Sequence, residues 1–161
     1  SAASAVDKAQ GGGCVALGGC SRDEPDPSLP IDDVAAVAEA VYPSEVTGYQ
    51  EFVETYIRGR SRGATGYRQA LDQVVADLNA MAREWYNDPL PALSRVDRDT
   101  LLREVGADTA EPRPDGTLAE RTRYYLVNDL LYALYTSPTG GELVGIQNPP
   151  GHPGGTASYH R

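Results

Sequence analysis

The chain has 161 residues, 40% of them hydrophobic, which is enough for one domain with a single core. Its formal net charge of −9 argues against binding to nucleic acid, which depends on clustered Lys and Arg, and against binding to anionic membrane surfaces. Lys8 is the only lysine among the 14 Lys and Arg residues. Acidic excess with almost no lysine predicts adaptation to concentrated salt, and a GC-rich genome is the other explanation for the bias toward arginine.

Residues 1–30 have the composition of an extended arm and contain both cysteines, Cys14 and Cys20. Three interpretations compete: a local disulfide, a bond or ligand contact to another chain, and lipidation of Cys20, because Leu17-Gly-Gly-Cys20 loosely matches a lipoprotein cleavage box. We favour a disulfide, within the chain or to another chain. The small-residue start at Ser1 fits the mature end left by a signal peptidase.

Residues 31–137 show the apolar spacing of helices, and we interpret them as one helical domain. The first predicted helix spans residues 31–42 and is closed by Pro43. The second carries a stripe from Tyr49 to Ile57. Residues 59–66, which follow it, are predicted to form a basic, glycine-rich turn.

The third predicted helix is the longest, at residues 67–86, and a shorter one follows at residues 97–105, with Gly106 as its C-terminal cap. A capping box of Thr117 and Glu120 begins the last helix, which Ser137-Pro138 stops. No segment alternates with period two. No apolar run approaches the about 20 residues of a membrane-spanning helix.

The last helix is apolar on nearly all sides between residues 124 and 135, which predicts that it is the buried central element. The expected fold is therefore all-α, with about five helices packed around a C-terminal one. Asn128 and Asp129 interrupt this apolar run, and a buried carboxylate needs a partner. Arg121, Arg123 or an arginine on a neighbouring helix could supply it. We favour this structural role over a catalytic acid, because no histidine or nucleophile lies at helical spacing.

Four tyrosines of the last helix face more sides than a small core can bury, which predicts that part of this helix meets another protein. They are Tyr124, Tyr125, Tyr132 and Tyr135.

The C-terminal strap, residues 138–161, holds six glycines and four prolines, so we expect neither a helix nor a central strand in it. It is nearly uncharged yet carries apolar side chains, which favours an ordered irregular segment held against its own domain or a partner. Its candidate interface residues are Pro138, Gly140, Gly141, Asn148, Pro149, Pro150, His152 and Tyr159.

The chain carries no recognisable set of catalytic residues, no metal-binding motif and no cofactor fingerprint. His152 and His160, the only histidines, are separated by eight positions without a completing cluster, which disfavours a ligand role. We therefore predict no catalytic, cofactor-binding or metal-binding residues.

Two segments carry a family resemblance. Tyr124-Tyr-Leu-Val-Asn-Asp-Leu-Leu-Tyr-Ala-Leu-Tyr-Thr-Ser-Pro-Thr-Gly-Gly141 and Val144-Gly-Ile-Gln-Asn-Pro-Pro-Gly-His-Pro-Gly-Gly155 resemble the C-terminal signature of the gluconate 2-dehydrogenase subunit 3 family. Ala40-Val-Tyr-Pro43 also fits. The resemblance covers residues 31–161, is most specific in the last forty, and looks like the haloarchaeal branch.

The resemblance implies a non-catalytic small subunit that binds and stabilises a large flavin-dependent sugar or alcohol dehydrogenase subunit and helps to export it through the twin-arginine route. FAD is then expected in the large subunit and no cofactor in this chain. A cytochrome c or another electron-transfer subunit is the expected further partner, and the complex is expected outside the cytoplasm. The alternative is a stand-alone exported or lipid-anchored surface binding protein.

Overall fold

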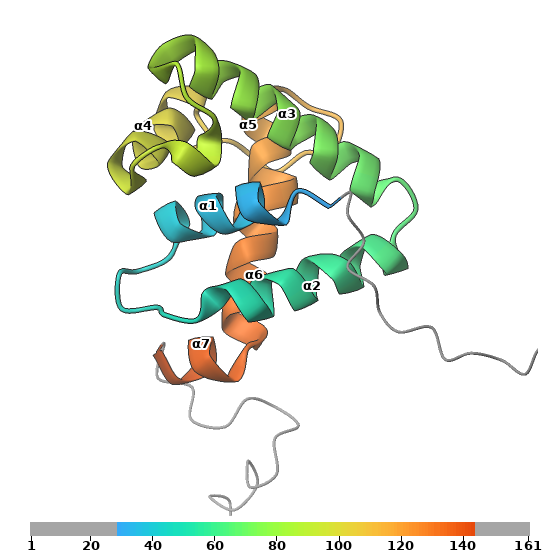
Figure 1. Ribbon diagram of the computed structural model, residues 1–161. Coiled ribbons are helices and arrows are strands. Elements are labelled where there is room, and N and C mark those ends of the chain that lie inside the picture. The colour runs from blue at the N-terminus through green and yellow to red at the C-terminus, as the bar shows by residue number, and fades with distance from the viewer. Residues whose placement is uncertain (1–28, 144–161) are drawn as a thin grey trace, which may run out of the picture.

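The structure, a computed structural model, describes residues 29–143, and every regular element in this range is helical (Figure 1). The α-helices are α1 (Ile31–Val41), α2 (Tyr49–Gly63), α3 (Tyr67–Tyr86), α4 (Arg95–Val105), α5 (Leu118–Thr122), α6 (Asn128–Thr136) and α7 (Pro138–Leu143). A 3-10 turn at Leu90–Ala92 precedes α4, and a π-helical segment at Arg123–Val127 joins α5 to α6. The predicted all-α fold is confirmed.

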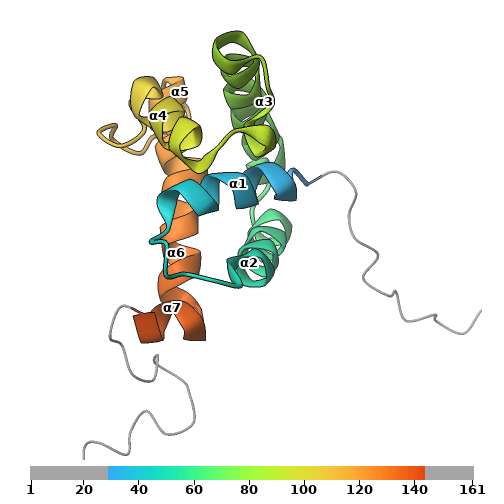
Figure 2. The ribbon, with the colours of Figure 1, turned by 60° about the vertical axis from the view of Figure 1, so that its left-hand side comes forward.

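A continuous helix over residues 118–136, made of α5, the π-helical segment and α6, runs as a column through the molecule. Figure 1 shows α1 and α2 crossing this column, and Figure 2 shows α2 nearly end-on beside it. In both views α4 lies near the α5 end of the column, and α7 lies at the opposite end. The core lies where these elements meet, and it buries Leu126 and Leu130 of the column completely. The expectation of helices packed around a buried C-terminal helix is therefore confirmed.

Several helix ends follow the sequence signals. The bounds of α3 are those predicted, and Asn87 ends it in the left-handed conformation at φ 63°. Gly106 caps α4 at φ 84°, a conformation that favours glycine. Thr117 and Glu120 form the predicted capping box, in which the Thr117 N–H donates to Oε2 of Glu120 at 2.7 Å.

The predicted basic turn at residues 59–66 is wrong over its first half, because α2 continues to Gly63. A helical glycine costs about 1 kcal/mol relative to alanine. Contacts with the preceding turns offset this cost: Arg58 pairs with Glu54 at 2.7 Å, and the Ser61 hydroxyl donates to the Ile57 carbonyl at 2.8 Å. The left-handed turn conformation falls on Gly66, directly before α3.

The expectation that no helix forms in residues 138–161 is wrong for its first six residues, which form α7. Ser137 ends α6 and also caps α7, because its hydroxyl accepts a 2.9 Å hydrogen bond from the Gly140 N–H. Pro138 occupies the first helical position, where its missing N–H costs nothing. Residues 1–28 and 144–161 lie outside the described part of the chain, so the division into arm, domain and strap stays a prediction. None of the described helices combines the length and apolar content needed to cross a bilayer.

Candidate functional site

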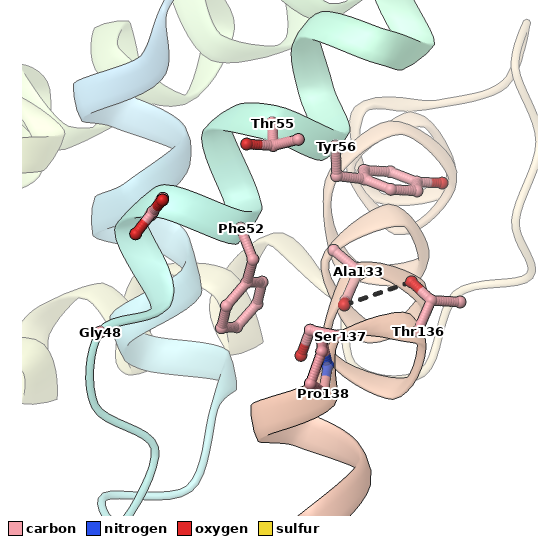
Figure 3. A pocket seen from close by; sticks show the side chains of 9 residues that line it. Gly48, Phe52, Thr55, Tyr56, Ala133, Thr136, Ser137 and Pro138 are labelled. Carbon is pink, nitrogen blue, oxygen red and sulfur yellow. Dashed lines mark hydrogen bonds between the residues drawn. The ribbon is translucent and has the colours of Figure 1, made fainter. Parts of the chain in front are cut away.

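A groove of about 400 Å³ lies between the first half of α2 and the junction of α6 with α7 (Figure 3). Phe52 and Tyr56 are one helical turn apart on α2; Phe52 points toward the end of α6, and Tyr56 points toward an earlier turn of the same helix. The opposite wall consists of Ala133, Thr136, Ser137 and Pro138. The groove thus joins aromatic side chains of α2 to a wall of small side chains, apolar and hydroxyl-bearing, and Glu51 and Thr55 add further polar groups to its lining.

The same side of the molecule exposes two tyrosines of α6. Tyr132 is 59% exposed and Tyr135 is 51% exposed. The Tyr132 ring lies 5.7 Å from that of Tyr56, which lines the groove, so Tyr132 adjoins the groove. Tyr135 follows three positions later on α6, one helical turn from Tyr132. We call the surface formed by Phe52, Tyr56, Tyr132 and Tyr135 the α2–α6 face. Half-buried and exposed aromatic residues of this kind are enriched at protein interfaces.

The other two tyrosines predicted to meet a partner lie on the inner side of the column. Tyr125 is 9% exposed, with its ring 5.8 Å from that of Tyr67 and 4.8 Å from that of Tyr124. Tyr124 is half-buried and packs against the core. These two rings are engaged within the chain and offer little surface to a partner.

The described start of the strap is packed against the end of α6. Gly140 and Gly141 are buried, and Pro138 is exposed at the groove. A Cβ atom at Gly140 would overlap the carbonyl oxygen of Leu134, so only glycine fits there. The other candidate interface residues, Asn148, Pro149, Pro150, His152 and Tyr159, lie outside the described residues, as do Cys14 and Cys20.

Asp129 is the one buried carboxylate among residues 29–143, and it lies at the start of α6. Tyr67 of α3 donates a 2.6 Å hydrogen bond to Oδ2, and Tyr56 of α2 donates one of 3.3 Å to Oδ1. Nε of Arg60, also on α2, lies 3.7 Å from Oδ2. Of the three sources of a partner that the sequence left open, the arginine on a neighbouring helix is the one that contacts Asp129.

The two arginines of the same helix have other contacts. Arg121 pairs with Asp77 at 3.0 Å, and Arg123 lies 3.5 Å from the carbonyls of Ala107 and Asp108. The sequence interpretation missed both phenol donors to Asp129, because Tyr56 and Tyr67 belong to apolar stripes and were assigned to packing alone.

The surroundings of Asp129 keep its neighbours protonated. Burial, together with the negative charge of Asp129, raises the pKa of Tyr56 to about 12 and raises the pKa of Tyr67 as well. Burial also raises the pKa of Asp129, against the opposing effects of the Tyr67 hydrogen bond and the Arg60 charge. At neutral pH both phenols are therefore hydrogen-bond donors, and the cluster serves to hold a carboxylate between three helices.

A second cavity, of about 500 Å³, opens beside this cluster and is lined by Tyr56, Arg60, Asn128, Asp129 and Tyr132. Tyr56 lines both the groove and this cavity. In the part of the chain that the structure describes, no group of three or more His, Cys, Asp and Glu residues is arranged to hold a metal ion.

Comparison with protein families gives one match. A family model described as gluconate 2-dehydrogenase subunit 3 matches residues 32–154. This range takes in almost all of α1, the other helices and the α2–α6 face. No curated protein and no solved structure gave a match.

Proposed function

The chain belongs to the gluconate 2-dehydrogenase subunit 3 family, and from this premise we propose that it is the non-catalytic small subunit that binds and stabilises a large flavin-dependent dehydrogenase subunit. FAD belongs to the large subunit in this proposal, and a cytochrome c or similar subunit accepts the electrons. The observation that carries the proposal is the α2–α6 face, where the exposed Tyr132 adjoins a groove lined by Phe52 and Tyr56, and the exposed Tyr135 lies one helical turn further along α6.

The shape of this face suits a protein partner. Phe52 and Tyr56 line one wall of the groove, and Pro138 lines the other. Aromatic anchors that fill such depressions contribute most of the binding energy in many interfaces. An apolar side chain of the large subunit inserted into the groove would cover Phe52. The two exposed tyrosines of α6 would then lie at the edge of the interface.

The use made of Asp129 supports a non-catalytic role. Both of its oxygens accept hydrogen bonds from phenols, and these bonds join α2 and α3 to α6. Both carboxylate oxygens are thus already engaged by donors of the chain itself, which favours a structural use of Asp129 over that of a general acid or base.

Purification from the native source tests the proposal. The chain should co-purify with a larger protein whose visible absorption spectrum is that of a bound flavin. Truncation after Ser137, which removes α7 and the rest of the strap, should abolish this co-purification while leaving most helical circular dichroism. Truncation after Leu143 keeps α7 and measures what residues 144–161 add. Recovery of the flavoprotein with the shorter chain would show that the strap is not needed for binding.

Export of the complex is part of the same proposal. Outside the cytoplasm, Cys14 and Cys20 can form the disulfide chemistry favoured by the sequence, with each other or with another chain. Mass spectrometry of the native chain separates this from the alternative. A diacylglycerol group on Cys20, with the chain monomeric at its native concentration, would favour a lipid-anchored surface binding protein.

A further inference from the structure

The cavity beside Asp129 is lined by a positively charged side chain, Arg60, that has an unsatisfied hydrogen-bond donor. Nε of Arg60 is buried without a hydrogen-bond partner among the described residues. Its 3.7 Å separation from Oδ2 of Asp129 is an ion contact and is too long for a hydrogen bond. A guanidinium has five N–H donors and no acceptor atom, so only acceptor groups can satisfy it.

Arg60 also lies against an aromatic ring of α3. Its Cζ lies 5.2 Å from the centre of the Tyr67 ring, which attracts the cation. The side chain is nevertheless 39% exposed, so part of the guanidinium faces the cavity. The site therefore presents an accessible positive group that lies against the Tyr67 ring.

The two phenols explain why Asp129 does not occupy the hydrogen-bond donors of Arg60. Tyr67 and Tyr56 donate to its two oxygens, so the strongest short-range contacts of the carboxylate are with tyrosines. Arg60 balances the charge of Asp129 at a longer distance. A second carboxylate entering the cavity could accept two parallel hydrogen bonds from the guanidinium, the geometry in which arginine binds carboxylates best.

We propose that this cavity receives the carboxylate of an Asp or Glu side chain of the large subunit. The proposal rests on the function proposed above and names the contact that gives the interface its specificity. A protein side chain is favoured over a free sugar acid because the cavity lies on the α2–α6 face and shares Tyr56 with the groove and Tyr132 with the exposed aromatic surface. A small acid would depend on a cation already beside one anion, whereas a tethered side chain is delivered by the rest of the interface.

Charge variants give predictions of opposite sign. Arg60→Gln removes the cation and should weaken binding of the purified flavoprotein by about 10- to 100-fold, the range for a lost charged hydrogen bond. Asp129→Asn keeps an acceptor for Tyr67 but leaves the charge of Arg60 unbalanced, so it should strengthen binding. The double variant Arg60→Gln/Asp129→Asn leaves no unbalanced buried charge and should bind as weakly as Arg60→Gln alone.

Arg103→Gln is the matched control, because Arg103 is a 63% exposed arginine of α4, away from the α2–α6 face. It changes the net charge by the same amount and should leave the dissociation constant within about twofold, as expected for a screened distant charge. Circular dichroism of each free variant checks that the helices are retained. Raising the salt concentration should weaken wild-type binding more than Arg60→Gln binding.

Three results would overturn the inference. In the first, Arg60→Gln binds the flavoprotein as Arg103→Gln does. In the second, Asp129→Asn weakens binding as much as Arg60→Gln, which would mark the cluster as structural only. In the third, gluconate or acetate binds the free wild-type chain saturably in a calorimetric titration and Arg60→Gln abolishes the binding, which would make a small acid the occupant. Failure of the wild-type chain to bind any flavoprotein would instead contradict the proposed function itself.

Discussion

The phenol of Tyr67 donates a 2.6 Å hydrogen bond to Oδ2 of Asp129, and this bond joins the first residue of α3 to the start of α6 across 62 positions of sequence. Tyr56 adds a donor from α2 to the other carboxylate oxygen. One buried acid thus ties three helices together beneath the α2–α6 face. This explains why a charged residue interrupts the most apolar helix of the chain.

Tyr67→Phe should destabilise the folded chain by about 1–3 kcal/mol, because Asp129 then loses its shortest hydrogen bond while remaining buried. Urea unfolding followed by circular dichroism measures the change in the free energy of unfolding. Tyr135→Phe is the control, since this 51% exposed side chain loses the same hydroxyl at the surface. Equal effects of the two variants would contradict the role of the Tyr67–Asp129 bond.

Asp129 should also give the stability a specific pH dependence. Burial raises the pKa of this carboxyl above its ordinary value, so the folded state keeps the proton at pH values where the unfolded chain has released it. Its contribution to the free energy of unfolding is therefore fully present below the ordinary aspartate pKa and declines as the pH rises through the folded-state pKa.

Asp129→Asn cannot titrate, so the comparison isolates this contribution from that of the other carboxylates. Urea unfolding across the acidic range should show the wild-type free energy of unfolding falling relative to that of Asp129→Asn as the pH rises, with a constant difference near neutrality. A relative increase with pH would mean that Tyr67 and Arg60 outweigh burial and lower the pKa of Asp129.

Two glycines that are both helical should respond oppositely to alanine. Gly140→Ala places a Cβ against the carbonyl oxygen and side chain of Leu134, so α7 should lose its packing on α6 and flavoprotein binding should weaken. Gly59 lies in α2 with open space around its Cα, so Gly59→Ala should stabilise the chain by up to about 1 kcal/mol.

The measurements for this pair are thermal unfolding and the dissociation constant of the flavoprotein complex. Unchanged binding by Gly140→Ala, with a stability equal to that of wild type, would show that α7 does not need its close approach to Leu134.

The fold could be predicted largely because local signals agree along most of the chain. The stripe of residues 67–86 is followed by Asp88-Pro89, and these together predict the bounds of α3. The glycines of α2 are ambiguous by comparison, since a turn and a helix stabilised by side-chain contacts both accommodate Gly59. Ser137-Pro138 is ambiguous in another way, because the same pair that ends α6 also begins α7.

The candidate site was only partly visible in the sequence. A need for a partner at Asp129 follows from its apolar surroundings, and the expectation of an arginine follows from charge. The sequence left open whether Arg121, Arg123 or an arginine on a neighbouring helix would supply it. The two tyrosine donors depend on how α2, α3 and α6 meet, which periodicity does not specify. Which of the four tyrosines of the last predicted helix face solvent also depends on how the helices pack: Tyr132 is exposed while Tyr125 is buried. The π-helical turn at Arg123–Val127 has no marker in the sequence pattern.

The central claim is that the α2–α6 face binds the large subunit. The most direct measurement is the dissociation constant of the flavoprotein complex for Tyr132→Ser/Tyr135→Ser, compared with Trp85→Ser/Val96→Ser, which removes the exposed apolar side chains of α3 and α4. We predict that the tyrosine pair variant loses at least about 30-fold in affinity, as for one interface hot spot, and that the control binds like wild type. Wild-type affinity of the tyrosine variant, or an equal loss in the control, would contradict the account.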